Sequence, residues 1–474
     1  NYNSCSVEGA LGGPITDSVS ARVSLHTDGR DGYTEDVTSG EDLDTVENTS
    51  IRAHLAMDLS ENLTLLLSGD YAKDNDGATP RKPINDEVYN VYFSPYQDTN
   101  PDAWEVDNSD NESFYLDRTI QGASAELQWD FSGHTLTSLT AYRDAENVAR
   151  IDNFGSPYPL LFSLEENVAN QWSQEFRLDN ANSAESLRWQ MGVYTLYEHV
   201  FRIDSKLFLV GLSNESQQES AQENKVKSGG AFGQGTYNFT DDTSLTVGVR
   251  YSRDEKDFKV FNAAIGDFQG LLLDDPIIDV EVEEKWEKVT GVITLDHRVT
   301  EDSFIYATLS QGYKSGGFNA EASTNELAMT PYDPEVVMNY ELGTKTEWFN
   351  QRLRFNASVF HMAYDDIQVE RFQDSGAVVI DNAGQATIDG IEFETTALLT
   401  ENITLTGGYS YLDAIYDEFD AGITDGEIQN YSGNRLSNSP KWTANLAAIY
   451  ELFLESGSTI QMRADYRGRS NVYQ

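Results

Sequence analysis

Aromatic side chains, with a few polar ones among them, gather in the irregular segments of this 474-residue chain. Aromatic rings offer flat contact area at a low entropic cost, and a few polar groups fix the orientation of a bound molecule. This combination favours recognition of a small molecule. The residues predicted to contact such a ligand are Tyr96, Trp104, Tyr115, Phe154, Tyr158, Tyr313, Lys314, Phe318, Asn319 and Tyr332. A place in an aromatic girdle or in loop packing is the alternative role for each of them, and the segment from Tyr313 to Asn319 also suits a structural feature.

Motifs of covalent catalysis and of nucleotide binding are missing from the sequence. The Gly-x-Ser-x-Gly pattern of a nucleophile elbow does not occur, and no glycine is followed by lysine, as a Walker A loop requires. None of the six histidines is followed by glutamate, which excludes the His-Glu-x-x-His zinc motif. With 79 acidic residues, two neighbouring carboxylates say nothing specific about acid–base catalysis. The sequence therefore predicts a protein that is not an enzyme and carries no cofactor or catalytic metal.

Strands must position the ligand-contacting residues, because apolar and polar side chains alternate through most of the chain. From Leu245 to Tyr251 and from Leu353 to Val359, every second residue is apolar. Successive strand side chains point to opposite faces, so each segment has one apolar and one polar face. The same alternation predicts about eighteen strands in all. No run approaches the roughly 20 apolar residues of a membrane helix, whereas a transmembrane barrel needs only about 10 alternating residues per strand.

The connections between these segments alternate between short and long. The short ones are 13–17, 59–62, 131–134, 182–185, 240–243, 299–302, 349–352, 399–402 and 455–458. The long ones are 27–49, 72–113, 144–168, 198–228, 253–285, 314–335, 366–388 and 413–438. Strict alternation places all long loops at one end of an antiparallel sheet, which indicates an all-β outer-membrane barrel with short periplasmic turns and long extracellular loops. A sheet in lipid leaves no edge unpaired, so the barrel must close.

Two sets of residues fit the two faces of such a barrel. Aromatic residues at or near the predicted strand ends suit the lipid headgroup level: Tyr71, Trp129, Phe131, Tyr142, Trp172, Trp189, Tyr251, Trp348, Trp442, Tyr450 and Tyr466. Charged residues on the opposite face indicate a wet or plugged lumen: Arg22, Arg52, Glu126, Arg143, Glu175, Arg177, Arg250, Glu341, Arg354 and Arg463. The core of a soluble sheet is the weaker alternative, because it does not explain the charged set.

Charge and cysteine content narrow the partners and the covalent structure. The net charge of -47 argues against nucleic acid, since phosphate binding needs a surface rich in lysine and arginine. Cys5 is the only cysteine, so no intrachain disulfide is expected. The first residues lack the basic and apolar regions of a signal peptide, and we expect any such peptide to have been removed.

Short motifs give the chain a family resemblance. Tyr-Lys-Ser-Gly-Gly-Phe-Asn at 313–319, Tyr-Asp-Pro-Glu at 332–335 and Tyr-Glu-Leu-Gly-Thr-Lys at 340–345 resemble segments of TonB-dependent outer-membrane receptors, in the branch that takes up iron complexes. The segments 174–178, 248–252, 360–368 and 390–394 agree with this resemblance. It covers nearly the whole chain, and its motifs are specific for the barrel but not for the ligand.

The resemblance implies a barrel of about 22 strands, in the bacterial cell outer membrane, with an N-terminal plug domain inside it. In such receptors the TonB complex pulls on a short box ahead of the plug and so drives uptake. This chain departs from that pattern, because no plug or TonB box precedes Asn1 and no terminal aromatic strand follows Gln474. We therefore expect residues 1–474 to form a transmembrane barrel domain that is incomplete at both ends.

The function implied by the resemblance is TonB-dependent, high-affinity uptake of a ferric siderophore or similar iron chelate. A glycan, cobalamin or another scarce nutrient is the alternative ligand. Haem ranks lower because the sequence lacks a Phe-Arg-Ala-Pro pattern. A passive porin-like channel is an alternative of a different class, and an outer-membrane enzyme is the most remote. The sequence names neither the ligand, nor the oligomeric state, nor any accessory protein.

The acidic residues are concentrated in two of the long loops. One is 72–113, and the other holds Asp413, Asp417, Glu418, Asp420, Asp425 and Glu427. A solvated loop surface is the simpler interpretation. Divalent cations are the alternative partners, because calcium prefers oxygen ligands, and such ions could bridge to the phosphates of lipopolysaccharide. We therefore expect lipid, lipopolysaccharide and divalent cations as surface partners of the barrel.

Overall fold

The structure is a computed structural model, which describes eleven stretches of the chain. These are residues 2–77, 80–81, 102, 104–106, 114–153, 161–180, 186–208, 216–266, 278–372, 378–424 and 427–472. Three of the predicted ligand contacts, Tyr96, Phe154 and Tyr158, lie outside these described residues.

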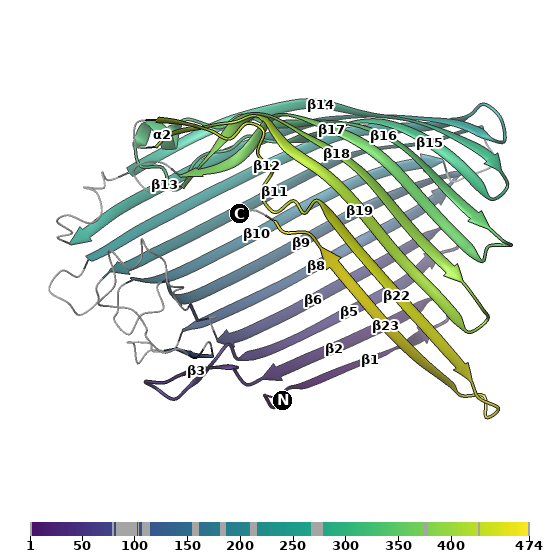
Figure 1. Cartoon of the computed structure of the whole chain (residues 1–474), viewed down its shortest axis with the longest axis horizontal. Coiled ribbons are helices and arrows are strands. Elements are labelled where there is room, and N and C mark those ends of the chain that lie inside the picture. The colour runs from purple at the N-terminus through teal and green to yellow at the C-terminus, as the bar shows by residue number, and fades with distance from the viewer. Residues whose placement is uncertain are drawn as a thin grey trace.

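One antiparallel sheet of 18 strands makes up nearly all of the described chain (Figure 1). The predicted fold class and strand number are thereby confirmed. The strands are β1 (Cys5–Thr16), β2 (Val19–Arg30), β5 (Val46–Ser60), β6 (Leu63–Gly77), β8 (Tyr115–Phe131), β9 (His134–Asp152), β10 (Leu161–Asn180), β11 (Leu187–Phe208), β12 (Ser216–Asn238), β13 (Thr243–Gly266), β14 (Ile278–Thr300), β15 (Ser303–Lys314), β16 (Glu335–Trp348), β17 (Leu353–Phe372), β18 (Val378–Leu398), β19 (Ile403–Glu418), β22 (Trp442–Phe453) and β23 (Thr459–Arg469).

Each strand of the sheet pairs with the strands before and after it, so the sheet is a simple meander that curves into a barrel wall (Figure 1). Within the described residues, β1 pairs only with β2 and β23 pairs only with β22. Small elements accompany the sheet at its outer end: β3 (Thr34–Asp36), β4 (Asp42–Leu43), β7 (Glu105–Val106), β20 (Asp420–Thr424), β21 (Glu427–Asn430) and the helix α2 (Asn325–Met329). They lie where the chain leaves the long strands.

A belt of exposed apolar side chains defines the membrane-facing surface. Val247, Val249 and Tyr251 of β13 and Leu342 of β16 are among the large exposed apolar residues. A circle of aromatic residues, called the upper aromatic ring and represented by Tyr251 and Tyr340, marks the edge of this belt away from the short turns. It lies eight residues from the turn end of its strands, since Tyr251 follows Thr243 by 251 - 243 = 8 and Tyr340 precedes Trp348 by 348 - 340 = 8. At about 3.3 Å per residue and a tilt of about 40°, eight residues span roughly 20 Å, close to the apolar band of outer-membrane barrels.

Seven of the eight predicted long loops are too long, because the strands continue well past this belt. Residues 198–228 were expected to be a loop, but β11 runs to Phe208 and β12 begins at Ser216. The same correction applies to six further loops, 27–49, 72–113, 144–168, 253–285, 366–388 and 413–438. The strands before them extend to Arg30, Gly77, Asp152, Gly266, Phe372 and Glu418. The aromatic residues of the upper ring were predicted at or near the strand ends. Because the strands are longer, these residues lie within the strands.

The outer parts of several long strands lack the alternation of apolar and polar residues, because charge pairs stabilise them instead. Above the belt the outer faces of β12, β13 and β14 are largely charged, so no apolar stripe marks these strands. The lysine Nζ atoms of Lys227 and Lys259 lie 3.0 Å from the carboxylates of Glu255 and Glu281 on the neighbouring strands. Such exposed cross-strand pairs each add a fraction of a kcal/mol, so backbone pairing carries most of the stability there.

The turn end of the sheet agrees with prediction. The connection after β16 holds Phe349, Asn350 and Gln351 with φ of 56°, 57° and 64°, a left-handed turn that asparagine tolerates better than most residues. The other short connections are equally compact. Among the described residues, no helix is long and apolar enough to cross a membrane.

The inner face of the wall carries the predicted charges, several of them in ion pairs. Arg143 reaches Asp70 with N–O distances of 3.0 and 3.1 Å, and Arg354 lies 2.9 Å from Glu347. The hydroxyl of Tyr306 donates to Glu341 at 2.5 Å. A polar inner face and an apolar outer face on the same strands are what a lumen surrounded by lipid requires.

Candidate functional site

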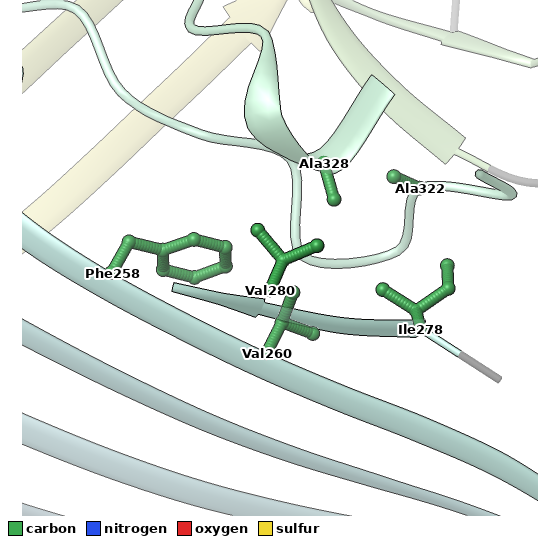
Figure 2. Close-up of a cluster of buried hydrophobic side chains, with 6 residues drawn as sticks. All are labelled: Phe258, Val260, Ile278, Val280, Ala322 and Ala328. Carbon is green, nitrogen blue, oxygen red and sulfur yellow. The ribbon is translucent and has the colours of Figure 1, made fainter. Parts of the chain in front are cut away.

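A cluster of buried hydrophobic side chains lies on the inner face of the sheet, above the membrane belt. Phe258, Val260, Ile278 and Val280 from the β13–β14 hairpin pack against Ala322 and Ala328 of the segment 315–334, which includes α2 (Figure 2). Phe258 and Val260 have the opposite parity to the exposed Val247 and Val249, so they point to the inside of the barrel. The segment 315–334 is therefore folded inward over the mouth.

Two glycines allow this segment to approach the strands. A Cβ atom on Gly316 would meet the Tyr332 carbonyl oxygen and, at 2.6 Å, Cε2 of Trp286. A Cβ atom on Gly317 would meet the hydroxyl and ring of Tyr332. Gly317 and Tyr332 are joined by two backbone hydrogen bonds of 2.9 and 3.3 Å. The Gly-Gly pair of the recognised motif thus permits close packing of this segment.

Two side-chain amides hold the segment on the neighbouring strands. They bond to backbone groups in the way that a paired strand would. Asn319 is buried, donates from Nδ2 to the Ile380 carbonyl at 3.0 Å, and accepts from the Ile380 N–H at 2.7 Å. Gln368 Nε2 donates to the carbonyls of Ser315 and Asp333, both at 3.0 Å. These bonds satisfy backbone groups that no strand partner could reach, which is why loss of one is costly.

Asn319→Ala is expected to weaken the attachment of the segment 315–334 by about 1–3 kcal/mol, because it leaves the partly buried amide of Ile380 without its side-chain partner. Hydrogen exchange at the Ile380 amide measures this directly. Glu321→Ala, at an exposed position in the same segment, serves as the control and should leave that amide protected. Unchanged exchange in Asn319→Ala would show that the side chain does not hold the segment.

Lys256 is a half-buried cation beneath this segment. Its Nζ donates to the Gly316 carbonyl at 2.6 Å and lies 5.6 Å from the ring centre of Trp286. It is 256 - 243 = 13 residues from the turn end of β13, above the membrane belt. Burial is the main cause that lowers the pKa of Lys256, and the nearby Lys314 charge acts in the same direction, against Asp254. Burial likewise raises the pKa of Tyr332, which packs on Gly317.

The lowered pKa of Lys256 predicts that attachment of the segment strengthens as pH rises toward 10. Between that pKa and the ordinary value of 10.5, the attached state has lost the proton while the detached state keeps it, so the detached state binds more protons. Above pH 10.0, the ordinary pKa of tyrosine, Tyr332 loses its proton in the detached state but keeps it in the attached state, because its pKa is raised there. Attachment of the segment therefore weakens as the pH rises further. Protease resistance of residues 315–334 measured across this range tests the sign.

Lys256→Met should remove this pH dependence, and Lys259→Met is the matched control on the same strand. Lys259 is exposed on the outer face and pairs with Glu281 at 3.0 Å, so its loss should leave the profile unchanged. If protease resistance of Lys256→Met rose with pH as it does in the unmodified protein, the pH dependence would belong to another group.

The structure brings together some of the predicted ligand contacts and separates others. Phe318 stacks on Phe258 with ring centres 5.5 Å apart, and Asn319 and Tyr332 lie in the same folded segment. Lys314 is exposed at the end of β15, and burial and the Asp254 charge raise the pKa of Tyr313 just before it. All five lie at one side of the mouth, where Phe318 and Asn319 also have structural roles; ligand contact stays a prediction.

Trp104 and Tyr115 lie elsewhere. Trp104 is 60% exposed, and its ring packs edge-on against Tyr33 with centres 5.5 Å apart. Tyr115 has the same strand parity as the exposed Trp129 of β8, which places it on the outer face. Sequence reasoning missed Lys256, Trp286 and Gln368, which sit in extended strands whose pairing no local pattern reveals.

Three carboxylates of the outer face are the one group among the described residues with metal-ligand spacing. Glu255, Asp257 and Glu283 bring their oxygen atoms within 4.8 Å of one another. Lys227 and Lys285 already pair with them, at 3.0 Å to Glu255 and 2.6 Å to Glu283. Pairing with Lys227 is also the main cause of the lowered pKa of Glu255. The group is therefore a charge network, and the predicted cation sites in the acidic loops stay untested.

Comparison with known proteins gives relatives of similar kind. The chain is 26% identical over 288 residues to the pesticin receptor of Yersinia enterocolitica, a match that covers 60% of this chain and 39% of that protein. It is 25% identical over 205 residues to the metal-pseudopaline receptor CntO of Pseudomonas aeruginosa, covering 43% of this chain and 25% of that protein. The chain thus spans less than half the length of these curated relatives.

Solved structures share the fold. The ferric yersiniabactin uptake receptor FyuA from Yersinia pestis superposes with a TM-score of 0.78 at 17% identity, covering 98% of this chain and 67% of that one. The siderophore receptor PiuA from Acinetobacter baumannii superposes with a TM-score of 0.70 at 14% identity, covering 98% and 72%. At such identities these structures support the barrel architecture alone.

A family model settles the relationship. The model described as TonB dependent receptor-like, beta-barrel, matches residues 23–474. It describes a family of transport receptors, which fits the prediction that the chain is not an enzyme. This chain, with its apolar outer belt, polar inner face and inward-folded outer segment, belongs to the TonB-dependent receptor β-barrel family of the bacterial outer membrane.

Proposed function

We propose that the receptor containing this barrel takes up a ferric siderophore or a similar iron chelate, with energy supplied by TonB through a plug domain. The observation that carries this is the family match over residues 23–474, together with relatives named as receptors for pesticin, metal-pseudopaline and siderophores. The strands that rise above the belt and the segment 315–334 folded over the mouth support a receptor that holds its ligand outside the membrane.

Uptake of iron-55 chelates by a deletion strain, with and without the full-length gene, tests this function. Uptake that depends on the gene, on TonB and on the proton gradient supports it. Uptake of glycans or cobalamin in place of iron would move the ligand to the alternative classes. Ion conductance of the full-length protein in a planar bilayer, without ligand or TonB, would favour the passive channel.

We also propose that lipopolysaccharide contacts the outer face just above the belt. Lys227, Arg253 and Lys285 have the parity of the exposed Tyr251 and Val289 and follow the upper aromatic ring. Lipopolysaccharide phosphates lie at this level in an outer membrane. Binding of purified lipopolysaccharide should weaken with salt and in a Lys227→Gln, Lys285→Gln double variant.

A further inference from the structure

A cavity of about 410 Å³ lies at the outer rim of the barrel, away from the segment 315–334. It is lined by Arg30, Tyr33, Asp44, Thr45, Val46, Asp76, Gly77, Arg81, Leu116 and Ile151. Five strands each contribute a residue of inner-face parity: β2, β5, β6, β8 and β9. The volume is within the range of small-molecule sites, and the position makes the cavity accessible from the lumen.

Asp44 is the unusual group in this cavity. It is only 4% exposed, and neither of its carboxylate oxygens has a hydrogen-bond partner in the described part of the chain. A buried carboxylate without a partner costs free energy that a cation or a strong donor would recover. Asp76, the other acid in the lining, already accepts from the Glu47 N–H at 3.0 Å. Asp44 therefore offers an unused acceptor for a positively charged group.

Two guanidinium groups face the same cavity. Arg30 donates to the backbone carbonyls of Asp31 and Asp44, at 3.4 and 2.9 Å. Arg81 donates to the carbonyl and side-chain oxygens of Asn153, both at 3.3 Å. Within the described residues, neither arginine pairs with a carboxylate, in a chain that has 79 acids and 32 basic residues. Each keeps donors suited to a carboxylate of a ligand.

Two aromatic rings lie next to Arg30 at this cavity. Arg30 lies over the ring of Tyr33, with 4.8 Å between its Cζ and the ring centre, and this fixes the guanidinium plane. Trp104 packs edge-on against the same Tyr33 ring, with centres 5.5 Å apart, and is 60% exposed, which leaves a flat surface for a further part of the ligand. Arg30, Tyr33 and Asp44 were not predicted, and Trp104 is the predicted contact that belongs here.

A metal ion does not fit this arrangement. The one group of three metal-ligating residues in the described stretches is Glu255, Asp257 and Glu283, on the opposite face of the sheet. Only two carboxylates line the cavity, and two arginines would repel a cation without its own negative ligands. The complement of this site is a molecule that carries both charges a short distance apart.

We propose that this cavity binds an end of the transported ligand that carries a protonated amine and a carboxylate, as an α-amino acid unit does. The amine pairs with Asp44, and the carboxylate pairs with Arg30 and Arg81. The inference deepens the proposed uptake function and rests on it only for the identity of the ligand as an iron chelate. The cavity itself is a binding site for a zwitterionic group, whatever that group is attached to.

Three matched probes test the site on the purified full-length receptor, without iron. Phenylalanine has both charges, N-acetylphenylalanine lacks the amine, and phenylalaninamide lacks the carboxylate. Saturation-transfer NMR should give phenylalanine a Kd at least about tenfold lower than either analogue, because each loses a charge-assisted hydrogen bond. Equal binding of the three probes, or no binding of phenylalanine at millimolar concentration, overturns the site.

Substitutions assign each charge to its residue. Asp44→Asn should bring phenylalanine down to the affinity of N-acetylphenylalanine, and Arg30→Gln should bring it down to that of phenylalaninamide. Asparagine suits the left-handed backbone at Asp44, where φ is 61°, so this variant should fold. Asp42→Asn in β4 and Arg22→Gln on the inner face of β2 are the matched controls. An equal loss in variants and controls would contradict the assignment.

Uptake separates this inference from the proposed function. A ferric trihydroxamate that carries a free α-amino acid tail should enter cells faster than the same chelate with an acetylated tail, and Asp44→Asn should abolish the difference. Phenylalanine binding without any iron uptake would contradict the proposed function and leave the site standing. Iron uptake that ignores the tail and Asp44 would contradict the site and leave the function standing.

Discussion

Gly317→Val is expected to detach the segment 315–334 from the wall of the barrel and to abolish ligand uptake. The added Cβ would overlap the hydroxyl and ring of Tyr332, and the two residues are also joined by backbone hydrogen bonds. The backbone hydrogen bonds hold the two residues side by side, so the clash is relieved only by displacing the half-buried ring of Tyr332. Overpacking of this kind costs about 1–3 kcal/mol. That cost is a large part of the free energy that attaches a segment of twenty residues to the wall. Limited proteolysis within 315–334 and iron uptake by cells are the two measurements.

A second substitution distinguishes the proposed clash from general damage. All the near atoms that the new Cβ would meet belong to the Tyr332 side chain, so Tyr332→Ala should partly restore protease resistance to Gly317→Val. Gly9→Val is the matched control, because a Cβ on Gly9 has no atom within 4 Å. Normal protease resistance of Gly317→Val would show that the two residues are not packed as described.

The inward fold of this segment has a consequence for how the mouth works. Lys256 reaches the segment from the β13–β14 hairpin and Gln368 reaches it from the β17–β18 hairpin, where Ile380 also bonds to Asn319 of the segment. The segment therefore bridges parts of the wall that are far apart in sequence. A bridge of this kind fixes the shape of the mouth on one side. The opposite rim, with Arg30 and Asp44, is built from strands of only two or three residues, β3, β4 and β7. Ligand-dependent movement is therefore expected at that rim first.

The sequence predicted the barrel well because its signal is local. Alternation of side chains, as from Leu245 to Tyr251, requires no knowledge of the partner strand, and each short turn separates two such segments. The aromatic rings at the two belt edges follow from the same pattern. The strand number of 18 is confirmed for this reason.

The outer half was harder to predict, because there the stabilising contacts are nonlocal. On β13, the outer-face residues Arg253, Glu255, Asp257 and Lys259 form no apolar stripe, and they pair through charges, as Lys259 does with Glu281 at 3.0 Å. The motif at 313–319 was recognisable, but its packing role depends on Trp286 and Ile380, which are distant in sequence. The cavity at the rim joins residues from five strands, and no spacing in the chain announces it.

Val247→Arg is expected to destabilise the folded barrel in lipid by about 2–4 kcal/mol. Val247 is four residues from Thr243 at the turn end of β13 and four from Tyr251 in the upper ring, so it lies at the middle of the belt. Its side chain is 48% exposed, between Gly235 and Ile293 on the same outer face. A charged side chain at the bilayer midplane carries this cost, which falls to about 0–1 kcal/mol near the interface. Urea unfolding from phospholipid vesicles measures it.

The same substitution higher on the same strand tests whether depth in the membrane is the cause. Phe261 shares the outer face with Val247, is 41% exposed, and lies 261 - 251 = 10 residues beyond Tyr251, in water. Phe261→Arg should therefore cost far less than Val247→Arg, although it removes the larger apolar side chain. If the two variants were equally destabilised, the belt would not lie between the two aromatic rings. The same result would contradict the extracellular placement of Lys256, the segment 315–334 and the rim cavity.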